Sequence, residues 1–281
     1  MRFTCNQMQF LSSEHFRVLL AVEMGSKNHE SVPLELIGKI AKSNCNIDSI
    51  ITDLVKQKFI KRMPSINTGY EGYALTYNGY DNLALHALQK EGIIQGLANK
   101  IGVGKESDLF LGLSPDQKLL CVKIHKLGRV CFKTVKNNRD YHENRKHASW
   151  MYMSRLSAQK EYEYMKEMYE KRLPMPRPHS QNRHIVVMEY LDGYTAMSKL
   201  QKSAKIIPLA LKSTLLSIID RIEQLGYAHG DFNEFNIMVR DDFKRVKVID
   251  FPQMVPLKDP KAAEYIKRDR EAIETYFKNF Q

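Results

Sequence analysis

Two short segments near the carboxyl-terminal end of the sequence place strong limits on its fold and chemistry. The first, His229–Asn236, contains an aspartate and an asparagine five residues apart, Asp231 and Asn236. The second, Val246–Phe251, begins with a hydrophobic strand pattern, and Asp250 stands at the end of this strand, fourteen residues after Asn236. Each of these residues on its own is compatible with a turn or a helix cap. Together, carboxylate and amide oxygens are the hard ligands that Mg²⁺ prefers, so their fixed order predicts a magnesium site.

A lysine upstream suggests which chemistry the magnesium serves. Lys123 lies in the β-prone run Lys118–Ile124, and alternation along a strand turns it away from Val122 and Ile124. A strand lysine followed by this loop and aspartate resembles the protein-kinase motifs. In that order Asp231 orients or deprotonates the attacking hydroxyl, while Asn236 and Asp250 hold the metal. An exposed strand lysine is the alternative reading of Lys123 taken alone.

A glycine-containing junction precedes this lysine. It connects the β-prone runs Ile93–Ile101 and Ser107–Gly112, and its residues Gly102, Gly104, Lys105 and Ser107 are candidates for phosphate binding. Backbone without side chains can approach phosphates closely. A plain hairpin turn explains the same residues equally well, because the third glycine of a GxGxxG pattern is absent.

The helix predicted over Tyr152–Arg172 offers an ion-pair partner for the lysine. Kinases use a helix glutamate for this purpose, and we assign Glu161 to it. Glu163 and Glu167 compete, because spacing alone does not separate the three carboxylates.

A buried strand predicted over Ile185–Met188 leads into a loop at residues 189–193. In kinases a strand followed by a loop at this point of the series is the hinge, whose backbone binds adenine. We therefore assign Met188, Glu189 and Tyr190 to the nucleotide site, although position in the series is the only argument.

The first 92 residues have a different character. Three short apolar-periodic helices precede two β-prone runs around Ile60 and Ala74, an order typical of a winged helix-turn-helix domain. Such domains contact nucleic acid through the third helix and the wing. The basic residues in this region are Lys56, Lys58, Lys61 and Arg62. Protein contact is the alternative, because 10 basic against 9 acidic residues leave this part nearly neutral.

The net charge of +11 comes almost entirely from residues 93–281, with 33 basic and 23 acidic residues, 33 − 23 = +10. Eight basic residues lie within Lys123–Lys146, and we expect Lys126–Lys146 to form a solvated basic loop that contacts anionic partners. The alternative is that this loop covers a nucleotide cleft.

The four cysteines form no CxxC pair, and no apolar run reaches 18 residues. A reduced, intracellular, soluble protein without a membrane partner is expected.

Several motifs in fixed order resemble the RIO family of atypical serine/threonine protein kinases, in particular its type 2 subfamily. The segments are IGVGKESD, GRVCFKTVKNNRDYH, ASWMYMSRLSAQKEY, HGDFNEFN and VIDFPQMV. The resemblance implies an α+β chain with a winged helix domain at residues 1–92 and a bilobal, truncated kinase-like domain at 93–281. Its N-lobe spans about 93–188, the hinge about 189–193 and the C-lobe about 194–281.

The resemblance also implies function. ATP and Mg²⁺, with Mn²⁺ as a substitute, are the expected cofactors, with Asp231 and Asp250 catalytic and Asn236 and Asp250 binding the metal. The expected role is an ATPase-like assembly factor in maturation of the small ribosomal subunit, in contact with its rRNA and without a DNA target. Autophosphorylation and transient phosphorylation of Asp250 are implied, as is a cytoplasmic location, with nuclear shuttling in a eukaryotic source.

Departures from ordinary protein kinases qualify the expected substrate. Pro252 replaces the glycine of the usual DFG motif, Gly230 replaces the arginine of HRD, and only 281 − 250 = 31 residues follow Asp250. The helical platform that binds peptide substrates does not fit into this length. A small-molecule phosphotransferase of the aminoglycoside or choline type is the alternative, since such enzymes share HGDxxxxN and IDF. A DNA-binding regulator with a degenerate kinase domain is disfavoured, because every catalytic position is filled.

Overall fold

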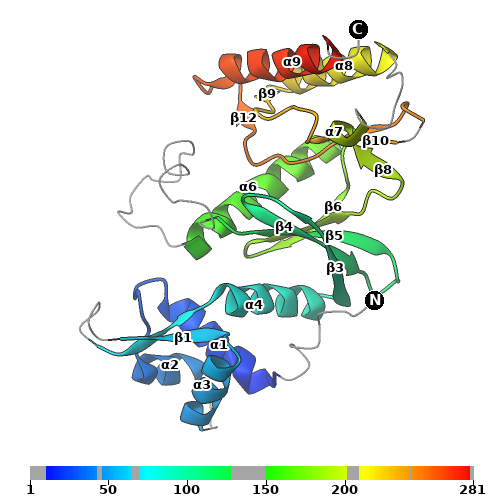
Figure 1. The fold of residues 1–281 in the computed structure, drawn as a ribbon. Helices are drawn as coiled ribbons and strands as arrows, with labels where there is room; N and C mark the ends of the chain where they lie inside the picture. Colours follow the sequence, from blue (N-terminus) through cyan, green and yellow to red (C-terminus); the bar gives the residue numbers. More distant parts are fainter. Residues whose placement is uncertain are drawn as a thin grey trace. The chain divides into compact units, whose positions relative to one another are not determined.

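The computed structural model describes residues 11–42, 46–64, 70–127, 150–200, 209–240 and 242–278 (Figure 1). The chain divides into two compact units. The first comprises Met1–Ser154 with Asn182–Ile185, and the second comprises Arg155–Gln181 with Val186–Gln281. The first unit thus contains the N-terminal helices together with the strands that follow them. The boundaries inferred from the sequence, at residue 92 and around the hinge, stay predictions.

The N-terminal part of the first unit has the predicted order of three helices and a hairpin, and a fourth helix follows the hairpin. Side chains of Ser12, Asn46 and Thr76 cap the amino-terminal ends of α1, α3 and α4. The elements are α1 (Ser13–Gly25), α2 (Leu34–Ala41), α3 (Ile47–Lys56), β1 (Ile60–Met63), β2 (Gly72–Leu75) and α4 (Tyr77–Lys90). The strands β1 and β2 pair antiparallel, with Ile60 opposite Leu75.

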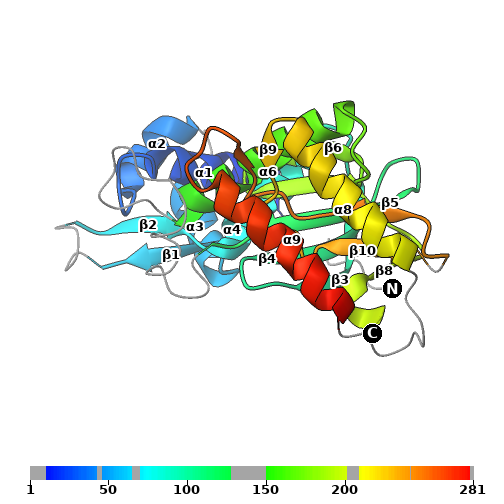
Figure 2. The same ribbon diagram turned by 90° about the horizontal axis from the view of Figure 1, so that it is seen from above.

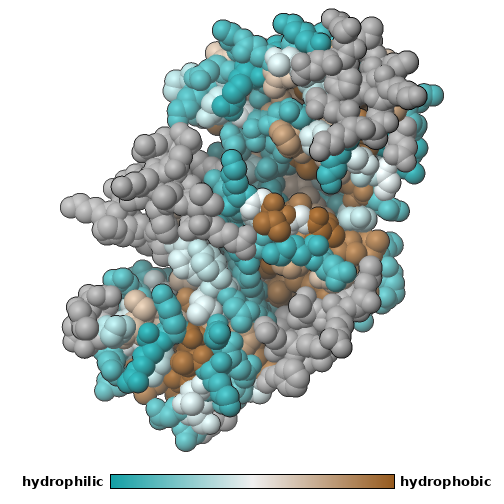
Figure 3. All heavy atoms as spheres, in the orientation of Figure 1, coloured by the Kyte–Doolittle hydropathy of each residue, from teal (hydrophilic) through white to brown (hydrophobic). Residues whose placement is uncertain are grey.

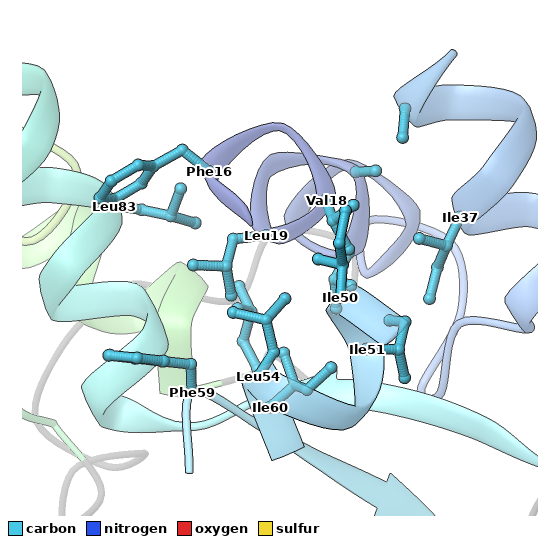
Figure 4. Packing of buried hydrophobic residues seen from close by; sticks show 14 of the residues in the cluster. Phe16, Val18, Leu19, Ile37, Ile50, Ile51, Leu54, Phe59, Ile60 and Leu83 are labelled. Carbon is cyan, nitrogen blue, oxygen red and sulfur yellow. The ribbon is translucent and has the colours of Figure 1, made fainter. Parts of the chain in front are cut away.

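One hydrophobic cluster joins these helices to the hairpin. Figure 4 shows side chains of α1, α3 and α4 converging on it, with Leu19, Leu54 and Leu83 among them. Leu19 and Leu54 have no exposed surface, and Phe59 is equally buried at the start of the hairpin. Burial of such side chains stabilises the fold by about 1.5–3 kcal/mol each, which explains why short helices persist here.

An antiparallel meander follows α4. It consists of β3 (Gly96–Val103), β4 (Ser107–Leu113) and β5 (Leu119–His125), in the order β3-β4-β5. The register places Lys123 of β5 opposite Leu109 of β4. The strand predicted from Ile93 begins only at Gly96, because Gly92, at φ 71°, ends α4 and the chain must turn before pairing.

The second unit is built mainly from helices with short strands between them. α6 (Trp150–Glu170) begins in the first unit, and β7 (Ile185–Glu189) crosses from the first unit into the second and pairs with β6 (Pro178–Asn182). Further small sheets have the orders β11-β10-β8 and β12-β9, and α8 and α9 lie side by side (Figure 2). The remaining elements are β8 (Tyr194–Ala196), α7 (Met197–Leu200), α8 (Leu209–Gln224), β9 (Tyr227–Ala228), β10 (Ile237–Arg240), β11 (Val246–Val248), β12 (Val255–Pro256) and α9 (Ala262–Lys278).

α8 ends at Gln224, just before a glycine that turns the chain. Gly226 adopts φ 92° after α8, and Tyr227 then enters β9.

Much of the described surface in Figure 3 carries hydrophilic side chains, with hydrophobic patches between them. Among the described residues, no helix has the length and apolar character that crossing a bilayer requires.

Candidate active site

Asp231 lies in the loop between β9 and β10, where two amide side chains hold its carboxylate. Asn233 Nδ2 donates to Asp231 Oδ1 at 2.9 Å, and Asn236 Nδ2 donates to Oδ2 at 2.9 Å. The same nitrogen of Asn236 donates to the Asp231 carbonyl, also at 2.9 Å. Because its Nδ2 is committed to Asp231, Asn236 presents its Oδ1 as the group able to bind a cation.

Asp250 follows β11 and is brought to this loop by a backbone contact. The N–H of Ile249 donates to the Asn236 carbonyl at 3.0 Å, so the two predicted metal ligands lie on adjoining segments. Asp250 has φ 71°, a left-handed conformation that aspartate tolerates better than most residues. The Asn236 amide oxygen and the Asp250 carboxylate are hard oxygen donors, and this donor set fits Mg²⁺.

The environment makes Asp231 a stronger base than an ordinary aspartate. Burial raises its pKa most, and the negative charge of Asp250 raises it further. The hydrogen bond from Asn236 acts in the opposite direction, because it stabilises the carboxylate. A raised pKa suits a group that accepts a proton from an attacking hydroxyl.

The loop is anchored from α9 by contacts that the sequence analysis missed. Asp269, only 2% exposed, accepts hydrogen bonds from the N–H groups of Gly230 and Phe232, both at 2.9 Å. Arg268 donates to the Gly230 carbonyl. The backbone on both sides of Asp231 is therefore fixed by one buried carboxylate.

A periodic signal in the sequence could have indicated Asp269. Ala262, Asp269, Ile273 and Tyr276 all belong to the buried face of α9, at helical spacing. A charged residue within an apolar stripe requires a buried partner, and here the partner is the catalytic loop.

His229 belongs to the hydrophobic core of the second unit. Its ring lies 5.6 Å from that of Phe232 and 5.3 Å from that of Phe251, measured between centroids. Burial lowers the pKa of His229, although nearby carboxylates, Asp269 first, oppose the shift. Phe232 follows Asp231 and Phe251 follows Asp250, so both segments pack against the same His229 ring.

The structure distinguishes the three glutamates of α6. Glu161 is 1% exposed, whereas Glu163 is exposed and accepts from Gln159 at 2.9 Å. Glu167 is bound elsewhere, to Lys171 at 2.6 Å and to the Tyr227 hydroxyl. Among these carboxylates, Glu161 alone is buried, as a partner of a site lysine should be.

The predicted lysine and glycine residues lie in the first unit. Lys123 is 6% exposed on β5. Gly102 lies within β3, and Gly104 donates its N–H to the Ser107 carbonyl at 2.7 Å, which closes the turn into β4 next to the exposed Lys105. The segment is a hairpin turn, and its contact with phosphates stays a prediction.

The predicted hinge follows β7. Met188 is 7% exposed, and the N–H of Glu189 donates to the Arg177 carbonyl at 2.8 Å. The Glu189 carboxylate in turn accepts from the Arg177 N–H at 2.9 Å. These groups of Glu189 bond to the backbone next to β6, and adenine binding by Met188, Glu189 and Tyr190 stays a prediction.

The prediction of a solvated basic loop was wrong for its first residue. Lys126 is 12% exposed and pairs with Asp81 at 2.9 Å and with Asp108 at 3.4 Å. Both partners are distant in sequence, so charge counting alone places Lys126 in solvent. Leu127, the next residue of the loop, is fully buried, and residues 128–146 of the loop lie outside the described residues.

Comparisons with known proteins identify the family. The RIO domain model matches residues 108–281, and the "Rio2, N-terminal" model matches residues 8–91. Serine/threonine-protein kinase rio2 of Schizosaccharomyces pombe is 48% identical over 98% of this chain and 78% of its own length. The Rio2 kinase of Methanocaldococcus jannaschii is 34% identical over 91% of this chain and 93% of its own length.

The solved structures agree with this result. A crystal structure of the Rio2 kinase-ADP/Mg²⁺-phosphoaspartate complex from Chaetomium thermophilum matches with a TM-score of 0.85 and 41% identity. The match covers 99% of this chain and 84% of the crystallised chain. This chain spans about half the length of the Rio2 relatives from Dictyostelium discoideum and Caenorhabditis elegans. On this evidence the chain belongs to the RIO family of atypical protein kinases, and within it to the Rio2 type.

Proposed function

We propose that this protein is an ATP- and Mg²⁺-dependent atypical serine/threonine kinase with ATPase activity. The observation that carries the proposal is the Asp231 carboxylate, held by Asn233 and Asn236 beside the predicted metal ligand Asp250. The related Rio2 complex with ADP and Mg²⁺ supports the choice of nucleotide and metal.

The residues divide the work of phosphoryl transfer between them. Asp231 accepts the proton of an attacking hydroxyl, while the hydrogen bonds from Asn233 and Asn236 keep its carboxylate in one orientation. Asn236 Oδ1 and Asp250 would hold Mg²⁺, which neutralises charge on the transferring phosphoryl group when bound. Lys123 and Glu161 are proposed to position the α- and β-phosphates of ATP.

We further propose that Asp250 can itself accept the phosphoryl group, and the phosphoaspartate in the related Rio2 complex supports this step. An oxygen of the Asp250 carboxylate attacks the γ-phosphorus, the bond to the β,γ-bridging oxygen breaks, and ADP leaves. Water then hydrolyses the acyl phosphate, releasing phosphate and restoring the carboxylate.

The biological setting is a separate part of the proposal. We propose a cytoplasmic assembly factor that acts in maturation of the small ribosomal subunit and contacts its rRNA. The resemblance to Rio2 proteins and the net charge of +11 support this setting. Cosedimentation of the protein with precursor subunits tests it, and a protein found only in fractions free of ribosomal particles contradicts it.

Nucleotide turnover by site variants tests the enzymatic proposal. Asp231→Ala should reduce turnover by about 100-fold or more while nucleotide affinity changes little, because Asp231 acts mainly in the transition state. Glu163→Gln is the matched control, since this side chain is exposed and accepts a hydrogen bond from Gln159, on the same helix. An Asp231→Ala variant with the turnover of the wild type would refute the assignment. Faster turnover in the presence of aminoglycosides or choline would support the small-molecule alternative instead.

A further inference from the structure

A buried polar cluster lies in the first unit, where α4 meets the end of β5. We call it the α4 junction, consisting of Asp81, Lys126, Asp108 and His184. Asp81 Oδ2 lies 2.9 Å from Lys126 Nζ, and Asp81 Oδ1 lies 2.7 Å from His184 Nε2. The side chains of Asp108 and His184 have no exposed surface, and that of Asp81 is 16% exposed.

The surroundings of Asp81 in the α4 junction favour its ionised form. Burial alone would raise its pKa, but the hydrogen bond with His184 and the positive charge of Lys126 bring the pKa below its usual value. Burial lowers the pKa of His184, so its ring is neutral at neutral pH and donates to Asp81. Among the described residues, the Asp81 carboxylate is thus the counter-charge nearest to Lys126, ahead of Asp108 at 3.4 Å.

The α4 junction fixes the end of the strand that carries the predicted ATP-binding lysine. Lys126 directly follows β5 and stands three residues after Lys123. The backbone is held as well, since the His125 N–H donates to the His184 carbonyl at 2.9 Å and the Lys126 N–H donates to the Glu106 carbonyl at 2.7 Å. The ion pair and these two hydrogen bonds together hold the end of β5, three residues from Lys123.

The same helix contacts the start of α6. The ring of Trp150 lies 3.9 Å from that of Tyr77 and 5.6 Å from that of Tyr80, measured between centroids. Tyr80 also stacks on the His184 ring at 4.3 Å. α6 carries Glu161 further along, so α4 contacts the start of the helix that bears Glu161 and the residue that directly follows the strand that bears Lys123.

We infer that Asp81, a residue of the N-terminal domain, is a positioning residue for the nucleotide site of the kinase domain. It orders the end of β5 through Lys126 and thereby fixes Lys123 for nucleotide binding. This inference rests on the proposed function, in which Lys123 binds ATP. It gives the N-terminal domain a role in nucleotide affinity that is separate from any contact with RNA.

Calorimetric titration of the full chain with Mg²⁺-ATP tests the inference. Asp81→Asn keeps the shape of the side chain but removes its charge, and the Kd for ATP should rise about three- to tenfold, with turnover at saturating ATP near that of the wild type. The matched control is Glu23→Gln, which breaks the Glu23–Arg183 ion pair at 2.7 Å next to His184 without contacting β5. Its Kd should equal that of the wild type.

A second variant covers the case in which Asp81→Asn does not fold. Lys126→Met removes the same ion pair from the other side, together with the Lys126–Asp108 pair, so Kd should rise at least as much, and the double variant should bind no more weakly than Lys126→Met alone. Folded Asp81→Asn and Lys126→Met variants with the Kd of the wild type would overturn the inference. An equal loss in Glu23→Gln would also overturn it, because general loosening would then be the cause. A wild-type protein that binds no ATP would instead refute the proposed function.

Discussion

Replacing Asp269 by asparagine alters a side chain that is 2% exposed and accepts two backbone hydrogen bonds at 2.9 Å. An amide keeps one acceptor oxygen and turns an NH₂ group toward the second backbone N–H, either that of Gly230 or that of Phe232. A hydrogen bond to a charged group contributes about 1.5–3 kcal/mol, and a buried N–H left unsatisfied costs a similar amount. Because these two terms overlap, the unfolding free energy should fall by about 2–4 kcal/mol.

Equilibrium urea unfolding followed by circular dichroism measures this loss. Turnover at saturating Mg²⁺-ATP should fall at least about tenfold as well, because the two N–H groups flank Asp231 and small displacements of a catalytic group are costly. Glu271→Gln on the same helix is the control, since this side chain is 64% exposed and its ion pair with Lys267, at 3.8 Å, lies on the surface. An Asp269→Asn variant that matches Glu271→Gln in both measurements would refute the reasoning.

Lowering the pH below 6.5 should reduce the unfolding free energy, because burial lowers the pKa of His184 and the unfolded chain binds this proton first. Urea titrations from neutral pH to about pH 5 measure the slope, to which His184 contributes up to about 1.4 kcal/mol per pH unit, and His184→Gln should flatten it. As the pH is lowered through the pKa of Asp231, which burial raises above 3.8, turnover should fall because the carboxylate becomes protonated. A pH–rate profile in which turnover does not decline on the acidic side at any pH above 3.8 contradicts the assignment. Gly230→Ala should cost about 2–3 kcal/mol in urea unfolding, because Gly230 has φ 79° and a Cβ would lie 2.7 Å from Tyr265. Gly226→Ala, at φ 92° with no atom within 4 Å, should cost about 1 kcal/mol, and equal losses would show that Tyr265 does not matter.

Local patterns explain why much of the site could be predicted from the sequence. Asp231 and Asn236 lie in one loop, so their spacing already determines that their side chains can meet, as the 2.9 Å hydrogen bond shows. The strand before Asp250 and the helices of the N-terminal domain likewise follow from short apolar patterns. Glu161 was assigned by resemblance, and only its burial separates it from Glu163.

Long-range contacts explain what the sequence did not reveal. Lys126 looks like one more charge in a basic run until Asp81 and Asp108, far away in the chain, are placed beside it. Asp269 looks like an ordinary charge on a surface helix until the loop backbone is packed against it. In both cases a buried charge is tolerated because of its partners, and partners distant in sequence leave no local pattern.

Radiolabelled phosphate transfer from [γ-³²P]ATP tests the central claim most directly, because it reports on the site and on the reaction together. The protein incubated with Mg²⁺ and labelled ATP should retain label as an acyl phosphate, which hydroxylamine releases. The folded Asp250→Asn variant should carry no hydroxylamine-sensitive label, because the accepting carboxylate is absent. Hydroxylamine-sensitive label of equal amount in Asp250→Asn, or wild-type protein that neither binds label nor hydrolyses ATP, would contradict the account.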